Sequence, residues 1–358
     1  MESIFFTRGV PARESIPVES LAKCAQDVIL ASGLDILQYA PAAGYLPLRK
    51  SLATKKKMDD SRVFLAQGSL QILDILLHCR LHPGDTVAVE QPTYDRVLTL
   101  MRRAHLEIVP IDLQSDGLDV EKLEKELNAG VPIRLLYVIP DFQNPSGISM
   151  SLEKRRRLVE LSLQFGFCIV EDSPYRNLRY AGEEIPSIFD LSPESVIQLS
   201  SYSKLISPGL RVGYAFLPPD MVGSVNRYAE DTYINASYLN HAIVHRFIQD
   251  GLLDEHLLFL KGLYGERLRI LLAALQENME GIGSWTIPQG GFFVGLWVNE
   301  KYDLSSLISR AAASELHLSA GHGFFMNGGE YFIRLPFCAL TPENITTGIA
   351  RLRQLILE

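Results

Sequence analysis

The sequence predicts an α/β protein that is built around a mostly parallel, doubly wound sheet, with a smaller α+β unit beside it. Between residues 60 and 220, short apolar runs alternate with stretches of helical periodicity. Two of these runs, Ile133–Ile139 and Phe167–Val170, are almost continuously apolar, which is typical of strands buried on both faces. Strands of this kind that alternate with amphipathic helices indicate a parallel sheet covered by helices on both sides.

The elements of this region follow one another at short intervals. The β-branched residues of Thr86–Glu90 favour a strand, and Pro83-Gly84-Asp85 forms a turn before it. In chain order the pattern predicts strand Val63–Ala66, helix Ser69–Arg80, strand Thr86–Glu90, helix Tyr94–Ala104, strand Leu106–Ile111, helix Val120–Leu127, strand Ile133–Ile139, helix Leu152–Phe165, and strands Cys168–Glu171, Val196–Ser200 and Val212–Phe216.

After residue 220 the pattern becomes mostly helical, and Asp254–Met279 is its longest stretch. A break at Gly281–Pro288 separates it from a smaller α+β unit, while the first forty residues show little regular pattern. We therefore predict a large domain over residues 45–275 and a discontinuous small domain over residues 1–44 and 276–358. The predicted elements of the small domain are strands Gly291–Val298, Leu316–Ala320 and Tyr331–Leu335 and helix Pro342–Leu357.

Composition limits the classes of function. The chain has 358 residues, of which 47% are hydrophobic and 21% charged, so a disordered or fibrous chain is excluded. Its net charge of −8 disfavours general binding to nucleic acid or to a membrane surface. No apolar run reaches the roughly 18 residues of a membrane span, and the N-terminus does not resemble a secretory signal. The four cysteines form no CxxC pair, so we expect a soluble, cytoplasmic protein without a disulfide framework.

The richest local signal is the run Ser201-Tyr202-Ser203-Lys204, which comes after a predicted strand and before Pro208-Gly209-Leu210-Arg211. The hydroxyls of Ser201 and Ser203 can donate to phosphate oxygens, and the planar guanidinium of Arg211 suits a phosphate group. Lys204 could act as a Schiff-base amine if desolvation and this positive charge lower its pKa. A solvated lysine and arginine on a loop is an equally simple interpretation.

Two further signals lie at strand ends. Gly68, Ser69 and Leu70 stand between a strand and a helix, where free backbone N–H groups can hold an anion, although Ser69 as a plain helix cap is the simpler interpretation. Asp172 directly follows a buried strand, at the sheet edge where α/β folds bind ligands, and Tyr175 comes shortly after it. An aspartate that only caps a helix would show the same pattern.

The remaining signals are weaker. Asn144 begins the run Asn144-Pro145-Ser146-Gly147 after a buried strand, but these residues also make ordinary turns. Tyr94 stands just past another strand, where it could equally be a core residue that starts a helix. His241 and His245 have i, i+4 spacing, but no third ligand accompanies them, so we predict no metal site.

Taken together, the order and spacing of these signals resemble those of the fold-type I pyridoxal-phosphate (PLP) enzymes, specifically the class I/II aminotransferases. Within that group the chain is most similar to aminoadipate and branched-chain aminotransferases and to the enzyme domain of a related regulator family. The lysine motif followed by Pro208–Tyr214 is the most specific part. The resemblance covers nearly the whole chain, through Leu37–Arg49, Gly68–Leu76, Pro83–Tyr94, Asn144–Gly147, Asp172–Tyr175 and Ser201–Tyr214.

The resemblance implies the PLP-dependent transferase fold of type I and a role for each candidate residue. Lys204 would carry PLP as a Schiff base and shuttle a proton, and Asp172 would keep the pyridine nitrogen protonated. Tyr175 and Asn144 would hydrogen-bond the ring oxygen of the cofactor, and Tyr94 would stack on its ring. The cofactor phosphate would be held by Gly68, Ser69, Leu70, Ser201, Ser203, Arg211 and, from a partner subunit, Tyr39.

The resemblance also implies how the substrate binds. Arg334 would clamp the substrate α-carboxylate, Asn144 would lie beside it, and Gly9 belongs to a loop that covers the substrate. The implied enzyme is a homodimer that interconverts an L-amino acid and a 2-oxo acid, with no nucleic-acid or membrane partner.

Two residues depart from the family pattern. Leu70 stands where relatives usually carry a polar residue, and Cys338 stands where a serine is usual. These departures, together with Arg8 at the rim of the predicted site, leave open a PLP-dependent lyase or cyclase on the same scaffold, such as a cyclodehydratase that acts on a hydroxylated arginine-type amino acid. The cofactor residues alone do not separate that alternative from an aminotransferase.

Overall fold

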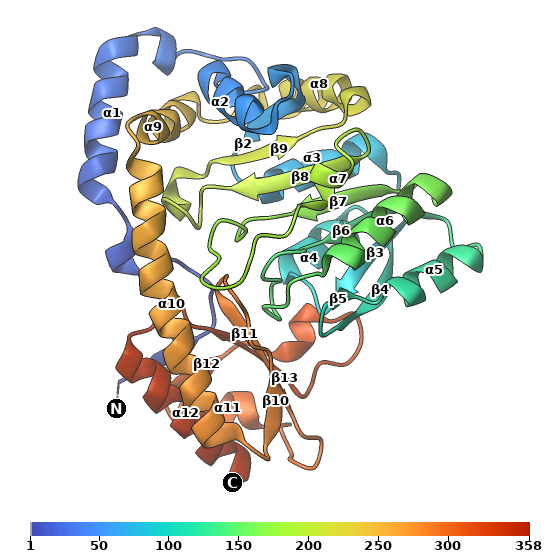
Figure 1. Cartoon of the computed structure of the whole chain (residues 1–358), viewed down its shortest axis with the longest axis vertical. Coiled ribbons are helices and arrows are strands. Elements are labelled where there is room, and N and C mark those ends of the chain that lie inside the picture. Colours follow the sequence, from blue (N-terminus) through green and yellow to red (C-terminus); the bar gives the residue numbers. More distant parts are fainter. Residues whose placement is uncertain (1) are drawn as a thin grey trace.

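The computed structural model describes residues 2–358 and is built around an eight-stranded sheet with strand order β2-β9-β8-β7-β6-β3-β4-β5 (Figure 1). Strands β8, β7, β6, β3 and β4 run parallel to one another, whereas β9 pairs antiparallel with β8 and β2, and β5 pairs antiparallel with β4. The strands are β2 (Val63–Ala66), β3 (Thr86–Gln91), β4 (Glu107–Gln114), β5 (Gly117–Leu118), β6 (Ile133–Val138), β7 (Cys168–Asp172), β8 (Val196–Ser201) and β9 (Gly213–Phe216).

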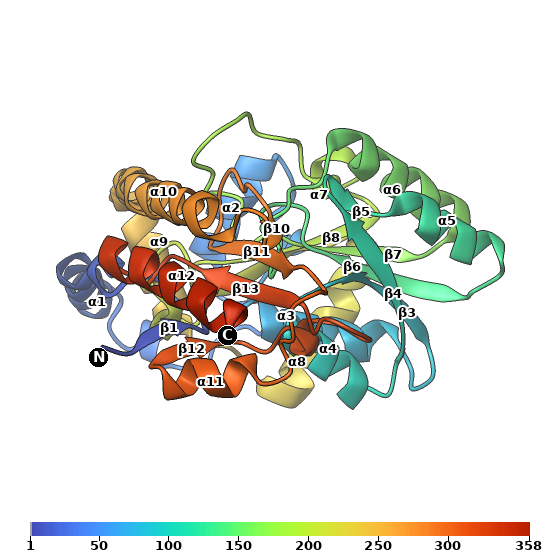
Figure 2. The same ribbon diagram turned by 90° about the horizontal axis from the view of Figure 1, so that it is seen from below.

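Helices cover both faces of this sheet. Figure 2 shows α5 and α6 on one side and α3, α4 and α8 on the other. Each side has its own apolar core, and every residue of the central strands β7 and β8 is buried. The mostly parallel, doubly wound sheet is therefore confirmed. The helices around it are α2 (Leu46–Lys56), α3 (Ser69–Arg80), α4 (Asp95–Arg103), α5 (Val120–Asn128), α6 (Leu152–Phe165), α7 (Ile188–Leu191), α8 (Val222–Tyr233) and α9 (Tyr238–Gln249).

The smaller α+β unit lies at the end of the molecule that holds the C-terminus (Figure 1). It contains an antiparallel sheet in the order β10-β11-β13 and a parallel pair of β1 with β12. The long helix α10 (Leu252–Met279) reaches this unit and packs against α12. The other elements are β1 (Ile4–Phe6), β10 (Gly283–Trp285), β11 (Phe293–Val298), β12 (Leu316–Leu318), β13 (Phe332–Pro336), α11 (Leu307–Ala313) and α12 (Pro342–Leu357).

The N-terminal segment is more regular than the sequence predicts. Residues Val18–Ser32 form helix α1, which packs against α9. Cys24 and Val28 of α1 are buried, and Leu21 and Ala25 are partly buried against the core, so α1 has an apolar face at helical spacing that the sequence prediction overlooked. Strand β1 joins the small unit through β12. The predicted break at Gly281–Pro288 also contains the short strand β10.

Candidate active site

A cavity of about 590 Å³ opens at the carboxyl ends of the parallel strands, where α/β sheets bind ligands. The loops after β6, β7 and β8 form its floor, and the N-terminal segment and the small unit supply its other walls. Thirteen of the fourteen predicted site residues line it: Gly9, Gly68, Ser69, Leu70, Tyr94, Asn144, Asp172, Tyr175, Ser201, Ser203, Lys204, Arg211 and Arg334.

Lys204 lies in the turn after β8, and its Nζ donates a hydrogen bond to the carbonyl of Gly9 at 2.8 Å. Burial lowers the pKa of the Lys204 amine, and the positive charges of Arg211 and Arg334 act in the same direction. Gly9 must be a glycine here, because a Cβ at this position would lie 2.3 Å from the Phe293 ring. The lysine is therefore a desolvated amine with a lowered pKa, as a nucleophile requires.

Asp172 is the last residue of β7 and is buried at the cavity floor. Its Oδ2 accepts a hydrogen bond from the hydroxyl of Tyr137, at 2.7 Å. Its Oδ1 has no hydrogen-bond partner within residues 2–358. Burial raises the pKa of Asp172 to about 6, against the effect of the Tyr137 hydrogen bond. A buried carboxylate oxygen without a partner fits a protonated ring nitrogen of a bound cofactor.

An anion cradle forms where α3 begins. The hydroxyl oxygens of Ser201 and Ser203 lie 2.9 Å apart, and Nη1 of Arg211 lies 3.5 Å from the Ser203 hydroxyl oxygen. Gly68 precedes α3 with φ +95°, and a Cβ there would approach Arg211 Nη2 to 2.5 Å. The free N–H groups at the start of α3, two hydroxyls and a guanidinium therefore converge on one point, which suits a phosphate.

Arg334 comes from β13 and lies between two aromatic rings. Its guanidinium carbon is 4.9 Å from the Phe293 ring centre and 4.5 Å from that of Phe324. Nη1 donates to Asn144 Oδ1 at 3.1 Å, and Nη2 donates to the Thr7 carbonyl at 2.5 Å. Nε is buried and finds no partner in the part of the chain that the structure describes. The rings hold the guanidinium plane in place, with donor capacity left for a carboxylate.

Two aromatic residues complete the cavity. Tyr175 is buried and packs edge-on against the Phe293 ring at 5.7 Å. Tyr94 precedes α4 and is partly buried. Burial raises the pKa of both hydroxyls, so both rings are neutral at ordinary pH and can donate hydrogen bonds.

Tyr39 is the one predicted site residue that does not line the cavity. It lies on the surface with 78% of its area exposed. Sequence reasoning missed three residues that do shape the site. Tyr137 reads as a core residue of an apolar strand, whereas Phe324 and Phe293 read as ordinary apolar residues. Only the hydroxyl of Tyr137, in a strand whose other buried residues are aliphatic, could have signalled its role.

Residues 2–358 show neither a metal-binding cluster nor a membrane-spanning helix. No group of three or more His, Cys, Asp and Glu side chains in this range could hold a metal ion. Within the same range, no helix is both long and apolar enough to cross a membrane.

Comparisons with known proteins agree with this geometry. The family described as aminotransferase class I and II matches residues 5–352. Aromatic-amino-acid aminotransferase 1 of Thermococcus litoralis is 33% identical over 98% of this chain and 87% of its own length. The crystal structure of a multiple-substrate aminotransferase from Thermococcus profundus has a TM-score of 0.94 and 33% identity, and covers 99% of this chain and 91% of that one.

A second solved relative was crystallised with a cofactor adduct. The α-aminoadipate aminotransferase of Thermus thermophilus, complexed with N-(5'-phosphopyridoxyl)-L-leucine, has a TM-score of 0.93 and 31% identity. The alignment covers 99% of this chain and 92% of that one. The unpartnered Asp172 oxygen, the anion cradle and the buried Lys204 suit the ring, phosphate and aldehyde of the same cofactor. The chain belongs to the class I and II aminotransferases and is a PLP-dependent aminotransferase.

Proposed function

We propose that this aminotransferase carries PLP on Lys204 and acts on L-amino acids with an aromatic or a long acidic side chain. The observation that carries the proposal is the single cavity that brings together a buried lysine, an unpartnered buried carboxylate oxygen, an anion cradle and an arginine fork. When bound, PLP supplies an aldehyde that condenses with amines and a ring that withdraws electrons.

The predicted site residues that line the cavity would each have a role toward the cofactor or the substrate. Lys204, a buried amine with a lowered pKa, would hold the cofactor and would carry the proton to and from the substrate carbon. Asp172 keeps a proton on the ring nitrogen through its free Oδ1, and the cradle around Arg211 anchors the phosphate. Asn144 and Tyr175 donate to the ring oxygen, and Tyr94 covers the ring face.

Arg334 would fix the substrate. Its free donor capacity suits the α-carboxylate, which places the adjacent carbon near Lys204 in the same cavity. The carbonyl of Gly9, which now accepts from Lys204 Nζ, belongs to the segment that would cover the substrate. Transamination is favoured over the lyase or cyclase alternative, because the similar proteins described above are aminotransferases.

The proposed substrate class rests on the cavity wall and on the relatives. Phe293 and Phe324 offer apolar surface, whereas the exposed Arg8 and Arg96 bring positive charge to the rim. Asp95 lies 3.8 Å from Arg96 and offsets part of that charge, so Arg8 is the better candidate for a distal carboxylate. An Arg8→Ala variant should lose kcat/KM for 2-aminoadipate while keeping that for phenylalanine, and equal losses for both would reject this assignment.

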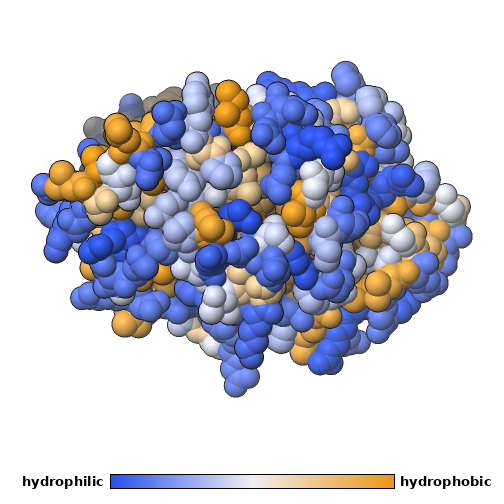
Figure 3. Space-filling view, turned by 90° about the horizontal axis from the view of Figure 1, so that it is seen from above, coloured by the Kyte–Doolittle hydropathy of each residue, from blue (hydrophilic) through white to orange (hydrophobic). Residues whose placement is uncertain are grey.

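We further propose that the active unit is a two-fold dimer. Exposed apolar side chains gather around Tyr39, among them Leu34 at 87% and Leu37 at 60% exposure. Figure 3 shows apolar side chains toward the left end of its face, where α1 lies. A second copy that covers this segment could bring its Tyr39 to the neighbouring phosphate cradle.

The test of the lysine assignment is direct. Borohydride reduction of the purified enzyme with PLP should fix the cofactor to Lys204, as located by peptide mass spectrometry. Amino acids supplied without an oxo acid should yield 2-oxo acids and pyridoxamine phosphate. Reduced cofactor on another lysine, or products that have lost water or ammonia with PLP regenerated, would overturn the proposal.

A further inference from the structure

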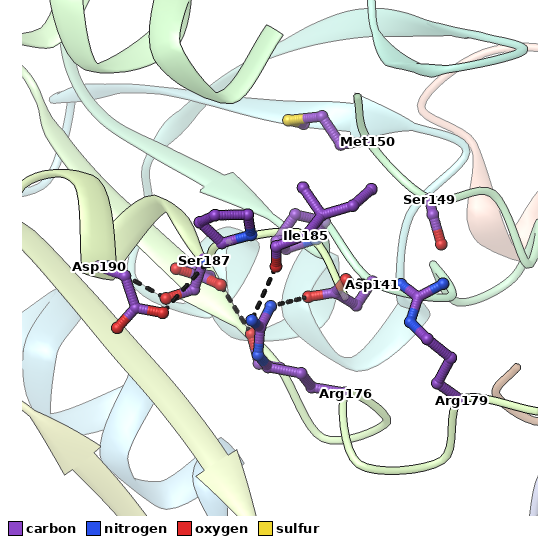
Figure 4. A network of polar contacts seen from close by, with 12 residues as sticks. Asp141, Ser149, Met150, Arg176, Arg179, Ile185, Ser187 and Asp190 are labelled. Atoms are coloured by element: carbon purple, nitrogen blue, oxygen red, sulfur yellow. Dashed lines mark hydrogen bonds and ion pairs between the residues drawn. The ribbon is translucent and has the colours of Figure 1, made fainter. Parts of the chain in front are cut away.

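A buried ion cluster joins two of the loops that line the cavity, and none of its own residues lines the cavity. Asp141, in the loop after β6, pairs with Arg155 of α6 at 2.9 Å and with Arg176 of the loop after β7, also at 2.9 Å. Arg179 lies 3.6 Å from the same carboxylate. The side chains of Asp141 and Arg155 are 1% and 0% exposed. Figure 4 shows Asp141 between Arg176 and Arg179. Charges this deep persist only when paired and hydrogen-bonded.

The arginines of the cluster also fasten the backbone around it. Arg155 donates to the carbonyls of Pro140 and Met150, at the two ends of the loop after β6. Arg176 donates to the Ile185 carbonyl at 2.7 Å, in the loop after β7 (Figure 4). The Asp141 carboxylate therefore links the loops after β6 and β7. Arg155 and Arg176, which pair with it, also hydrogen-bond the backbones of these two loops.

These two loops carry the groups that face the cofactor ring oxygen in the proposed function. Asp141 precedes Asn144 by three residues, and Arg176 directly follows Tyr175. Asn144 Oδ1 accepts from Arg334, so the amide nitrogen at the other end of its side chain is available to donate into the cavity. A shift of either loop would move a donor away from its acceptor.

We propose that Asp141 is a positioning residue that holds Asn144 and Tyr175 side by side through Arg155 and Arg176. It does not line the cavity, so it would touch neither substrate nor cofactor. This inference rests on the proposed roles of Lys204, Asn144 and Tyr175, and it assigns a function to an ion cluster that the reaction itself does not use.

The expected effect is on the proton of the Lys204–PLP linkage. Two donors on the ring oxygen stabilise its negative charge and weaken its hold on the proton that it shares with the lysine nitrogen. When the donors are displaced, the oxygen holds that proton more tightly. The pKa of the linkage, followed by its visible absorbance against pH, should therefore rise.

The experiment compares four variants of the PLP-loaded enzyme. Asp141→Asn should raise the linkage pKa by about one unit, a tenfold change in proton affinity. Arg176→Gln should raise it in the same direction, and its partly exposed side chain makes folding a lesser concern. Asn144→Ala calibrates the direct effect, and the Asp141→Asn/Asn144→Ala pair should shift less than the sum of the single variants.

A matched control separates positioning from general loss of stability. Leu158 is a fully buried residue of α6 that belongs to the core and not to the cluster. Leu158→Ala should lower the melting temperature and leave the linkage pKa at the wild-type value. The inference would be overturned if Asp141→Asn and Arg176→Gln both showed the wild-type linkage pKa. If Asp141→Asn does not fold, a wild-type linkage pKa in Arg176→Gln alone would overturn it. Failure of the wild type to form the linkage at Lys204 would instead overturn the proposed function.

Discussion

The hydroxyl of Tyr137 donates a hydrogen bond to Oδ2 of Asp172 at 2.7 Å, whereas Oδ1 of the same carboxylate meets no partner in residues 2–358. The two oxygens therefore have different surroundings. One is held by β6 from inside the sheet, and the other is left for a ligand. Burial raises the pKa of Asp172 to about 6, and the Tyr137 hydrogen bond opposes that rise. Tyr137 thus helps to keep ionised the carboxylate that we propose pairs with the cofactor ring nitrogen.

Replacing Tyr137 by phenylalanine should expose this dependence. The loss of a hydrogen bond to a charged group costs about 1.5–3 kcal/mol, so kcat/KM at neutral pH should fall about tenfold or more. The pKa of Asp172 should rise further, which moves the acid limb of the pH–rate profile to higher pH. PLP should remain attached to Lys204. A wild-type acid limb in Tyr137→Phe would show that Tyr137 does not tune Asp172.

Arg334→Lys tests the carboxylate clamp. Lysine keeps the positive charge but loses the planar fork and its packing between Phe293 and Phe324. We expect kcat/KM to fall by about ten- to a hundredfold for every amino acid, because two charge-assisted hydrogen bonds become one. The cofactor spectrum without substrate should not change. A loss confined to one class of side chain would mean that Arg334 reads the side chain instead of the α-carboxylate.

Much of the site could be predicted because its residues stand at strand ends. The carboxyl ends of parallel strands meet at one edge, so Asn144, Asp172 and Lys204 converge once the strand order is right. Tyr137 escaped prediction because its signal is a single hydroxyl within a strand whose other residues are mostly apolar. Its partner on the neighbouring strand is defined only by the register of β6 with β7.

The ion cluster was also beyond sequence reasoning, for a different reason. Arg155 stands within the basic run of α6, where the helix surface is the natural location for a charged residue. Its full burial depends on the ion pair with Asp141. Asp141 stands 14 residues earlier in the chain, and no sequence motif connects the two residues. Helix α1 is a different case, because Leu21, Cys24, Ala25 and Val28 recur at helical spacing and could have been recognised in the sequence as one face of a helix.

Glu90 provides a prediction for the pH dependence of stability. Its Oε2 accepts from the Ile139 N–H at 3.0 Å and from Gln143 at 3.2 Å, and burial raises its pKa from 4.5 to about 8. A carboxyl whose pKa is raised on folding stabilises the protein most below pH 4.5, and this contribution is lost as the pH rises to about 8.

The comparison with Glu90→Gln isolates this effect, because glutamine does not titrate. Between these two pH values, the free energy of unfolding of the wild type should fall relative to that of the variant, by up to about 1.4 kcal/mol per pH unit. Melting temperatures of the two proteins measured in parallel buffers check this. A difference that stays constant with pH would show that Glu90 titrates alike in the folded and unfolded chains.

Tyr39, the predicted cofactor residue that lies outside the cavity of its own chain, provides a test of the proposed dimer. If Tyr39 contacts the phosphate bound by a partner subunit, Tyr39→Phe should bind PLP more weakly. Lys204→Ala subunits lack the linkage but carry an intact Tyr39. A mixed dimer of the two variants then has one site with both Lys204 and Tyr39, and the PLP affinity of that site should return to the wild-type value.

The control is a mixture of Tyr39→Phe with the double variant Tyr39→Phe/Lys204→Ala, which contains no intact Tyr39. Both mixtures should form mixed dimers to the same extent by mass measurement, and only the first should regain wild-type affinity in an absorbance titration with PLP. Equal affinities in the two mixtures would mean that Tyr39 acts within its own subunit or not at all. An enzyme that stays active as a monomer would remove the shared site altogether, because no partner would then be present to complete the cradle around Arg211.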